Sequence, residues 1–180
     1  MTSQPKQMFG EPISPVGPTP ADLESTTELE KLLREAGLYE SPEESTVREE
    51  VLRDLQGIVD RWVKQLAFQH GYPDAMVEEA TALLVPFGSY RLGVHGRVPV
   101  PDAHVPVMKI RFHDVQVDLV YASVNLAVVP RDLDLGDRSV LRGLDHATAR
   151  SLNGVRVAYE ILRLDPDAGA FRMASRCVSA

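Results

Sequence analysis

Hydrophobic residues recur every three or four positions in the first half of the chain, and this spacing predicts two long helices. The first helix is expected to begin at Pro20, with Thr19 as its N-cap, and to end at Gly37. The second helix follows Ser41, the first residue of a Ser-Pro-Glu-Glu capping box. It is expected to end near His70, and its apolar positions are Val47, Val51, Leu55, Ile58, Trp62 and Leu66.

The pattern changes after the second helix. A short helix over residues 74–80 is predicted behind Pro73, because proline favours the start of a helix. Residues 82–87 are a continuous apolar run that stops at Gly88 and Ser89. Such a run predicts a buried strand that is followed by a turn.

Two more apolar runs, over residues 105–112 and 115–121, are separated by only two residues. This spacing predicts a β-hairpin. Residues 139–164 show helical periodicity, with Gly143 and Gly154 as weak points in the predicted helix. Beyond this helix the hydrophobic pattern fades.

Composition places these elements in one domain with an extension at each end. The chain has 180 residues, of which 44% are hydrophobic, enough for a single core. A proline-rich leader is expected over residues 1–20, a domain over 21–164 and a tail over 165–180. The net charge of −7 excludes a strongly basic nucleic-acid module as a description of the whole chain. The one cysteine, Cys177, excludes an internal disulfide, and no apolar run is long enough to span a membrane.

The Gly88-Ser89 dipeptide is the first candidate binding feature. A strand that ends in Gly-Ser and leads into a helix presents backbone N–H groups to a phosphate, and the serine hydroxyl adds a donor. Arg91 and His95 follow at short range with further positive charge. Because Gly-Ser pairs are common in turns, an ordinary turn is the more frequent explanation of the dipeptide alone.

Asp118 is the second candidate, because it interrupts an apolar strand. Burying a carboxylate without a partner is costly. Asp118 is therefore expected either to bind a metal ion at the surface of the sheet or to accept a hydrogen bond from a neighbouring N–H group. The residues alone leave both roles open.

Three segments, in one order, resemble the eukaryotic poly(A) polymerases. They are FGSYRLGVH (residues 87–95), VPVMKIRFHDVQVDLVYA (105–122) and the run over residues 130–162, which contains DLDL and SLNGVRVAYEIL. The leader segment EPISPVGPTPADLEST is similar to the amino-terminal segment of that family. The resemblance extends from about Gly10 to Arg172, and three ordered segments are far more specific than a lone Gly-Ser pair.

This resemblance implies an α/β (α+β) nucleotidyltransferase fold of the polymerase-beta-like kind, with a mixed sheet and flanking helices. The family adds AMP from ATP to the 3′ hydroxyl of RNA without a template, with two divalent ions, Mg²⁺ or Mn²⁺, held by three carboxylates. The resemblance therefore implies ATP and an RNA 3′ end as ligands and 3′-end processing proteins as partners. It also implies mRNA polyadenylation as the process and the nucleus as the location.

The matching motifs imply roles for five residues. Gly88 and Ser89 correspond to the turn that holds the triphosphate, and Phe87 matches a position close to the nucleotide. Asn153, in the SLNG segment, is expected near the nucleotide site. Asp118 corresponds to the third metal-binding carboxylate and is the catalytic candidate.

The other two carboxylates are missing from their expected place. The family has an Asp-x-Asp pair shortly after GSYRLGVH, whereas here Gly96 is followed by Arg97 and a valine- and proline-rich segment. An internal deletion at this junction would remove sheet strands, so the fold is expected to be incomplete. Asp102 and His104 are poor substitutes, because Mg²⁺ prefers oxygen ligands. The family also continues into further domains, so the carboxyl end is expected to be truncated.

Asp132 and Asp134 have the right spacing for a metal-binding pair, but they follow Asp118 instead of preceding it. They are expected to be loop and cap residues. The sequence thus predicts a catalytically defective short variant of a poly(A) polymerase. The alternative is a non-catalytic binding module, or a by-product, that sequesters a 3′-processing partner. A different nucleotidyltransferase, such as a uridylyl- or aminoglycoside-modifying type, fits the SYRLGVH and LNG segments less well.

Overall fold

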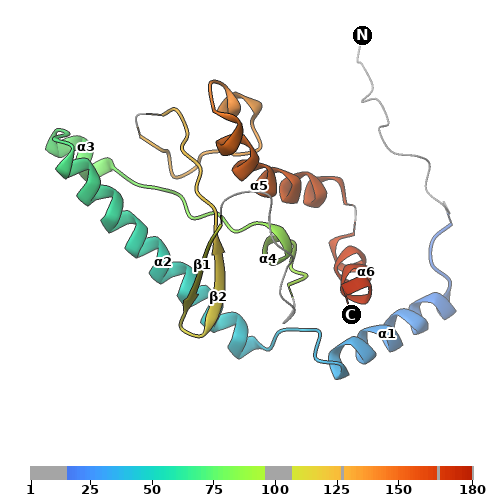
Figure 1. Ribbon diagram of the computed structural model, residues 1–180. Helices are drawn as coiled ribbons and strands as arrows, with labels where there is room; N and C mark the ends of the chain where they lie inside the picture. Colours follow the sequence, from blue (N-terminus) through green and yellow to red (C-terminus); the bar gives the residue numbers. More distant parts are fainter. Residues whose placement is uncertain (1–15, 96–106, 127, 166, 180) are drawn as a thin grey trace, which may run out of the picture.

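The computed structural model describes residues 16–95, 107–126, 128–165 and 167–179, so Asp102, His104 and most of the leader lie outside the described residues. In this part of the chain, no helix is both long and apolar enough to cross a membrane. The elements, shown in Figure 1, are in chain order α1 (Pro20–Glu35), α2 (Pro42–Gln69), α3 (Asp74–Glu79), α4 (Gly88–Leu92), β1 (Met108–Phe112), β2 (Val115–Leu119), the 3-10 helix η1 (Arg138–Leu141), α5 (His146–Leu164) and α6 (Ala168–Ser179).

Both predicted capping boxes are formed. The Thr19 hydroxyl accepts a hydrogen bond from the N–H group of Asp22 at 3.3 Å, and the Asp22 carboxylate accepts one from the N–H group of Thr19 at 2.8 Å. Ser41 and Glu44 make the equivalent pair at the start of α2, at 3.1 and 3.0 Å. The predicted starts of α1 and α2 are therefore confirmed, as is the short helix α3.

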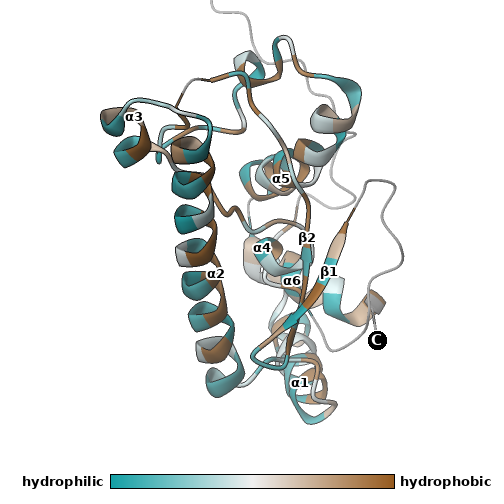
Figure 2. Cartoon of the chain, turned by 60° about the vertical axis from the view of Figure 1, so that its left-hand side comes forward, coloured by the Kyte–Doolittle hydropathy of each residue, from teal (hydrophilic) through white to brown (hydrophobic). Residues whose placement is uncertain are grey.

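Helix α2 is amphipathic, but only part of its apolar side is covered. Figure 2 shows a hydrophobic stripe along one side of the helix. Val51 and Leu55 on this stripe are 1% and 5% exposed, whereas Ile58 and Trp62, one and two turns further on, are 41% and 51% exposed. The predicted periodicity is confirmed, and packing covers the stripe near its middle.

The predicted hairpin is also confirmed. Strands β1 and β2 are antiparallel, with Ile110 opposite Val117. His113 and Asp114 form the turn with φ angles of 47° and 62°, and two positive φ angles are typical of a type I′ hairpin turn. The class is α+β and the sheet is incomplete, because within the described residues it consists of this antiparallel pair and not of the expected mixed sheet.

The predicted strand over residues 82–87 is wrong. The segment is extended, but it pairs with no strand of the described part of the chain. The side-chain amide of Gln56 on α2 supplies the bonds that a neighbouring strand would otherwise provide. Its Nε2 donates to the carbonyl oxygen of Ala82 at 2.7 Å, and its Oε1 accepts from the N–H group of Leu84 at 2.9 Å. A side chain thus replaces sheet pairing for this segment.

The main hydrophobic core lies against α5. Leu135, Leu152 and Val155 are buried together there. The partly buried side chains around them come from the extended segment before α4, from the chain after β2 and from η1 and its loops. This packing brings the 82–87 segment, and therefore the turn that follows it, against α5.

The single helix predicted over residues 139–164 is divided in two. Gly143, with a φ of +74°, ends the first part after η1. Helix α5 then begins at His146, because the Asp145 carboxylate accepts hydrogen bonds from the N–H groups of Ala147 and Thr148 at 2.8 and 2.9 Å.

The residues after 165 form a helix, α6, which the fading hydrophobic pattern did not predict. The Asp167 carboxylate accepts hydrogen bonds from the N–H groups of Gly169 and Ala170 at its start. Helix α6 contacts α1, and the two helices lie at the same end of the molecule (Figure 1).

Candidate functional site

The Gly88-Ser89 turn connects the extended segment to α4. Phe87 has an extended backbone, with a φ of −145°, and the next residue, Gly88, has a φ of +62°. Glycine adopts positive φ without strain, so it allows the abrupt change from extended chain to helix. No side chain of the described residues caps α4, so the backbone N–H groups of its first turn donate no hydrogen bond to a capping side chain. The predicted turn is present, although it follows an unpaired segment and not a strand.

The Phe87 ring packs closely against α5 because Gly154 has no side chain at the point of contact. A Cβ atom on Gly154 would lie 2.5 Å from Cδ2 of Phe87, closer than carbon atoms approach each other. Only glycine therefore leaves room for the ring at this point of α5. Asn153, the residue before Gly154, is exposed on the same helix. The structure thus brings the helix that carries Asn153 against Phe87 at the start of the turn.

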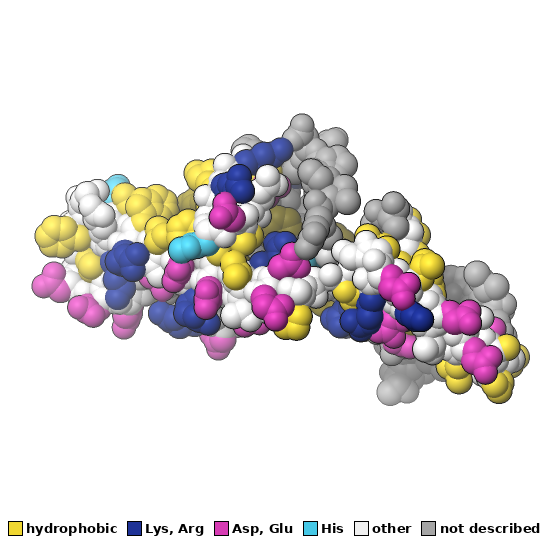
Figure 3. Space-filling model, turned by 90° about the horizontal axis from the view of Figure 1, so that it is seen from below, with side chains coloured by type: hydrophobic (Ala, Val, Ile, Leu, Met, Phe, Trp, Pro, Cys, Tyr) yellow, Lys and Arg dark blue, Asp and Glu magenta, His cyan; other side chains and the backbone are white. Residues whose placement is uncertain are grey.

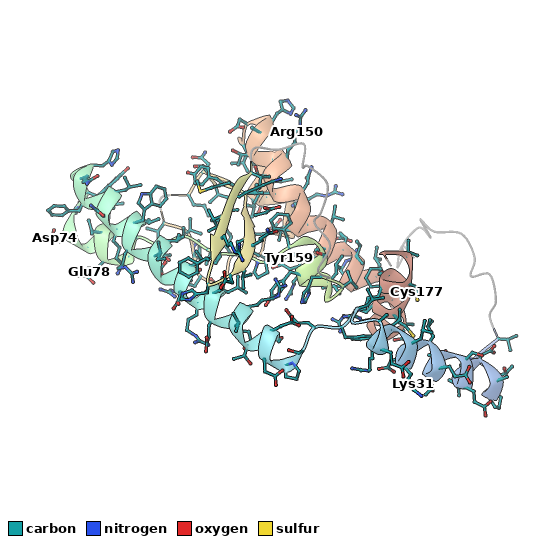
Figure 4. All side chains as sticks on the ribbon, turned by 60° about the horizontal axis from the view of Figure 1, so that its bottom comes forward. Lys31, Asp74, Glu78, Arg150, Tyr159 and Cys177 are labelled. Carbon is teal, nitrogen blue, oxygen red and sulfur yellow. The ribbon has the colours of Figure 1, made fainter. Side chains whose placement is uncertain are left out.

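A second contact joins α4 to α5. The guanidinium of Arg91 lies 5.4 Å from the centre of the Tyr159 ring, a cation–π distance. Figure 4 shows Tyr159 on the part of α5 that lies beside α4. The turn is thus held by an aromatic ring at its start and by a cation–π contact one turn later.

Glu40, before α2, fixes the residues that follow α4. Its carboxylate accepts hydrogen bonds from Arg48 and from Nε2 of His95, the latter at 2.8 Å. Burial alone would raise the pKa of Glu40, but the hydrogen bonds and charges of His95 and Arg48 outweigh it and lower the pKa. Burial raises the pKa of Tyr90, whose ring lies 4.9 Å from that of His95.

Asp118 belongs to no three-ligand metal site in the described part of the chain. It lies on β2, opposite Lys109 in the strand register, and it is exposed. The part of the chain that the structure describes contains no group of three His, Cys, Asp or Glu residues that could hold a metal ion. These residues therefore do not fit the three-carboxylate site that the resemblance implies.

Asp134 of the DLDL segment and the nearby Asp137 serve local structure. The Asp134 carboxylate accepts a hydrogen bond from the N–H group of Gly136 at 2.8 Å. Asp137 caps η1 through the N–H group of Ser139, also at 2.8 Å, and this bond lowers the pKa of Asp137. Asp134 is thus a turn residue, as predicted.

Comparison with known proteins points to one family. A family model described as "Poly(A) polymerase nucleotidyltransferase domain" matches residues 9–98 and 97–164. Nuclear poly(A) polymerase 2 of Arabidopsis thaliana is 45% identical over 205 residues, which cover 93% of this chain and 26% of the relative. Poly(A) polymerase of Dictyostelium discoideum is 38% identical over 205 residues, covering 93% of this chain and 25% of the relative. The chain thus spans about a quarter of the length of these relatives.

The same comparisons bear on the predicted deletion. The two matched segments meet at residues 97 and 98, next to the junction predicted between Gly96 and Arg97. The alignment with the Arabidopsis relative is 205 residues long, more than the 180 residues of the chain, so the relative contains positions that have no counterpart here. The junction of the two matched segments agrees with a segment missing after the Gly88-Ser89 turn.

Proposed function

The chain belongs to the poly(A) polymerase nucleotidyltransferase family, and we propose that it is a member that binds a nucleotide without transferring AMP to RNA. The observation that carries this proposal is that Asp118 is not part of a three-ligand group among the described residues. Asp118 is an exposed carboxylate on a two-stranded sheet, and the described residues bring no second and third ligand beside it. A two-metal site needs several oxygen ligands around each ion.

Nucleotide binding is assigned to Phe87, Gly88, Ser89 and Asn153. In support of this, the first turn of α4 has no side-chain cap, so its N–H groups are available to a phosphate. The ring of Phe87 is fixed on α5 beside the turn, where it packs against the hydrophobic core. In this role the chain is a non-catalytic binding module of its family.

The metal ions supply the chemistry of the family reaction. If bound, Mg²⁺ or Mn²⁺ would supply Lewis-acid stabilisation of charge on the phosphate and the attacking hydroxyl. Because the described residues do not fit such a site, no catalytic step is assigned to this chain. Its relatives include proteins named nuclear poly(A) polymerases. By family, we assign this chain to the nucleus, with ATP and RNA 3′ ends as ligands and 3′-processing proteins as partners.

The test measures binding and transfer separately. ATP binding is followed by calorimetry in the presence of Mg²⁺, and transfer by extension of a short RNA primer with Mg²⁺ or Mn²⁺. We expect ATP binding that Ser89→Ala weakens by about tenfold, the effect of a lost charge-assisted hydrogen bond. Ser123→Ala, which removes an exposed hydroxyl after β2, is the matched control and should change nothing.

We expect no primer extension by the natural chain. Extension that is abolished by Asp118→Asn would show a working metal site and would overturn the proposed loss of catalysis. No ATP binding by a chain whose circular dichroism shows folded helices would overturn the nucleotide-binding part.

A further inference from the structure

A cavity lies where α6 packs between α1 and the end of α4. Its volume is about 370 Å³, within the range of small-molecule sites. Glu30 and Tyr39 line it on one side, and Arg172 and Arg176 of α6 line it on the other. Figure 4 shows α6, marked by Cys177, beside α1, marked by Lys31.

Both arginines donate to backbone carbonyls at the end of α4. Nε of Arg172 donates to the carbonyl oxygen of Leu92 at 2.9 Å, and Nη2 of Arg176 donates to that of Gly93 at 2.5 Å. A Cβ atom on Gly93 would lie 2.9 Å from Nε of Arg172, so glycine is needed for this approach. These bonds hold the two guanidinium groups at the cavity.

Among the described residues, the two arginines have no acidic partner in an ion pair. The carbonyl oxygens that they bind carry no formal charge. Among the described residues, Glu30 is the one acidic residue that lines the cavity, and its carboxylate already pairs with Arg34 at 2.6 Å. Elsewhere the chain is acidic, and Figure 3 shows acidic side chains spread along its underside.

Arg176 also has an unused donor. Its Nε is buried and makes no hydrogen bond, and its guanidinium lies 4.2 Å from the centre of the Tyr39 ring. The guanidinium of Arg34 lies 4.4 Å from the same ring centre. A buried donor without a partner destabilises a protein.

We propose that this cavity binds a phosphate group. A phosphate dianion matches the two positive charges, and guanidinium groups bind phosphate oxygens through paired N–H donors. The side chain of Met173, which also lines the cavity, offers apolar surface to an organic substituent of the phosphate. Gly93, at the end of α4, lines the cavity, whereas Ser89 and the other residues of the proposed nucleotide turn do not.

The test uses inorganic phosphate and phenyl phosphate as probes, with sodium chloride at matched ionic strength as the reference. Binding to the full chain is measured by calorimetry. We expect Arg176→Gln to weaken phosphate binding by at least about tenfold, since it removes one of two charges that contact the anion. Arg163→Gln is the control, because Arg163 is exposed on α5 and pairs with Glu160, and it should bind as the natural chain does.

A second variant keeps the test valid if Arg176→Gln fails to fold. Glu30→Gln removes the carboxylate from the cavity and releases Arg34, so it should strengthen phosphate binding by about two- to fivefold. The side chain of Glu30 is 41% exposed, and the loss of an exposed ion pair costs little stability.

The two probes also separate the possible sources of the ligand. Tighter binding of phenyl phosphate supports a small organic phosphate as the occupant, and equal affinities support free phosphate. The proposal is overturned if neither probe binds more than chloride does. It is also overturned if the affinity is the same in the natural chain, Arg176→Gln and Glu30→Gln.

Discussion

Gly57 in α2 and Gly154 in α5 lie inside long helices, and their surroundings predict opposite effects of an added methyl group. At Gly57 a Cβ atom would meet Nη1 of Arg61 at 3.6 Å, an ordinary contact. At Gly154 it would lie 2.5 Å from the ring of Phe87. We expect Gly57→Ala to stabilise the protein by about 0.5–1 kcal/mol, through helix propensity. Gly154→Ala should destabilise it by about 1–3 kcal/mol, because the ring must move.

The measurement is urea unfolding followed by circular dichroism, with Gly57→Ala as the matched control for Gly154→Ala. Phe87 precedes the nucleotide turn, so Gly154→Ala should also weaken ATP binding, while Gly57→Ala should not. Stabilisation by both substitutions would contradict the close packing of Phe87 on α5.

At the scale of single elements, the sequence predicts the features that depend on contacts between residues close in the chain. The caps of α1 and α2 join residues only three positions apart, and the hairpin turn joins neighbouring residues. The prediction of a strand over residues 82–87 is wrong because Gln56 bonds backbone groups of this segment. Gln56 is 26 and 28 positions away from the residues it binds. Nothing in the apolar run itself indicates such a partner.

The candidate site also has features that the sequence predicts and contacts that only the folded structure shows. The Gly88-Ser89 turn is visible in the sequence, because its glycine and serine stand directly after the apolar run. Gly154 looked like a weak point of a helix, although its role is to make room for Phe87. The contact of Arg172 with Leu92 joins residues 80 positions apart, so it could be found only in the folded structure.

The bonds made by Gln56 give a direct prediction for the extended segment. Gln56→Ala leaves the carbonyl of Ala82 and the N–H group of Leu84 without their partner, and we expect a loss of about 1–3 kcal/mol in the free energy of unfolding. Gln65→Ala, at an exposed position of the same helix, should change it by less than about 0.5 kcal/mol. Equal stabilities of the two variants would show that the segment is held by other contacts.

At the scale of the whole molecule, burial is limited. The described residues include seven buried hydrophobic side chains, whereas fifteen large hydrophobic side chains are exposed. Exposed apolar residues occur in every protein, but here they include Trp62, Phe68 and Tyr121, which are 51%, 70% and 73% exposed. A domain with so few buried hydrophobic side chains gains little hydrophobic stabilisation. This gain must offset the conformational entropy that the chain loses on folding.

The apolar stripe of α2 allows this weakness to be measured. Leu55 is 5% exposed, and Ile58, less than one turn further on, is 41% exposed. Leu55→Ala should cost about 2–5 kcal/mol, the usual loss for a buried leucine, whereas Ile58→Ala should cost less than about 1 kcal/mol. If the natural chain is stable by only a few kcal/mol, Leu55→Ala removes its cooperative thermal transition in circular dichroism, and Ile58→Ala keeps it. A cooperative transition of Leu55→Ala that is shifted by only a few degrees would mean that the chain is better packed than its exposed side chains indicate.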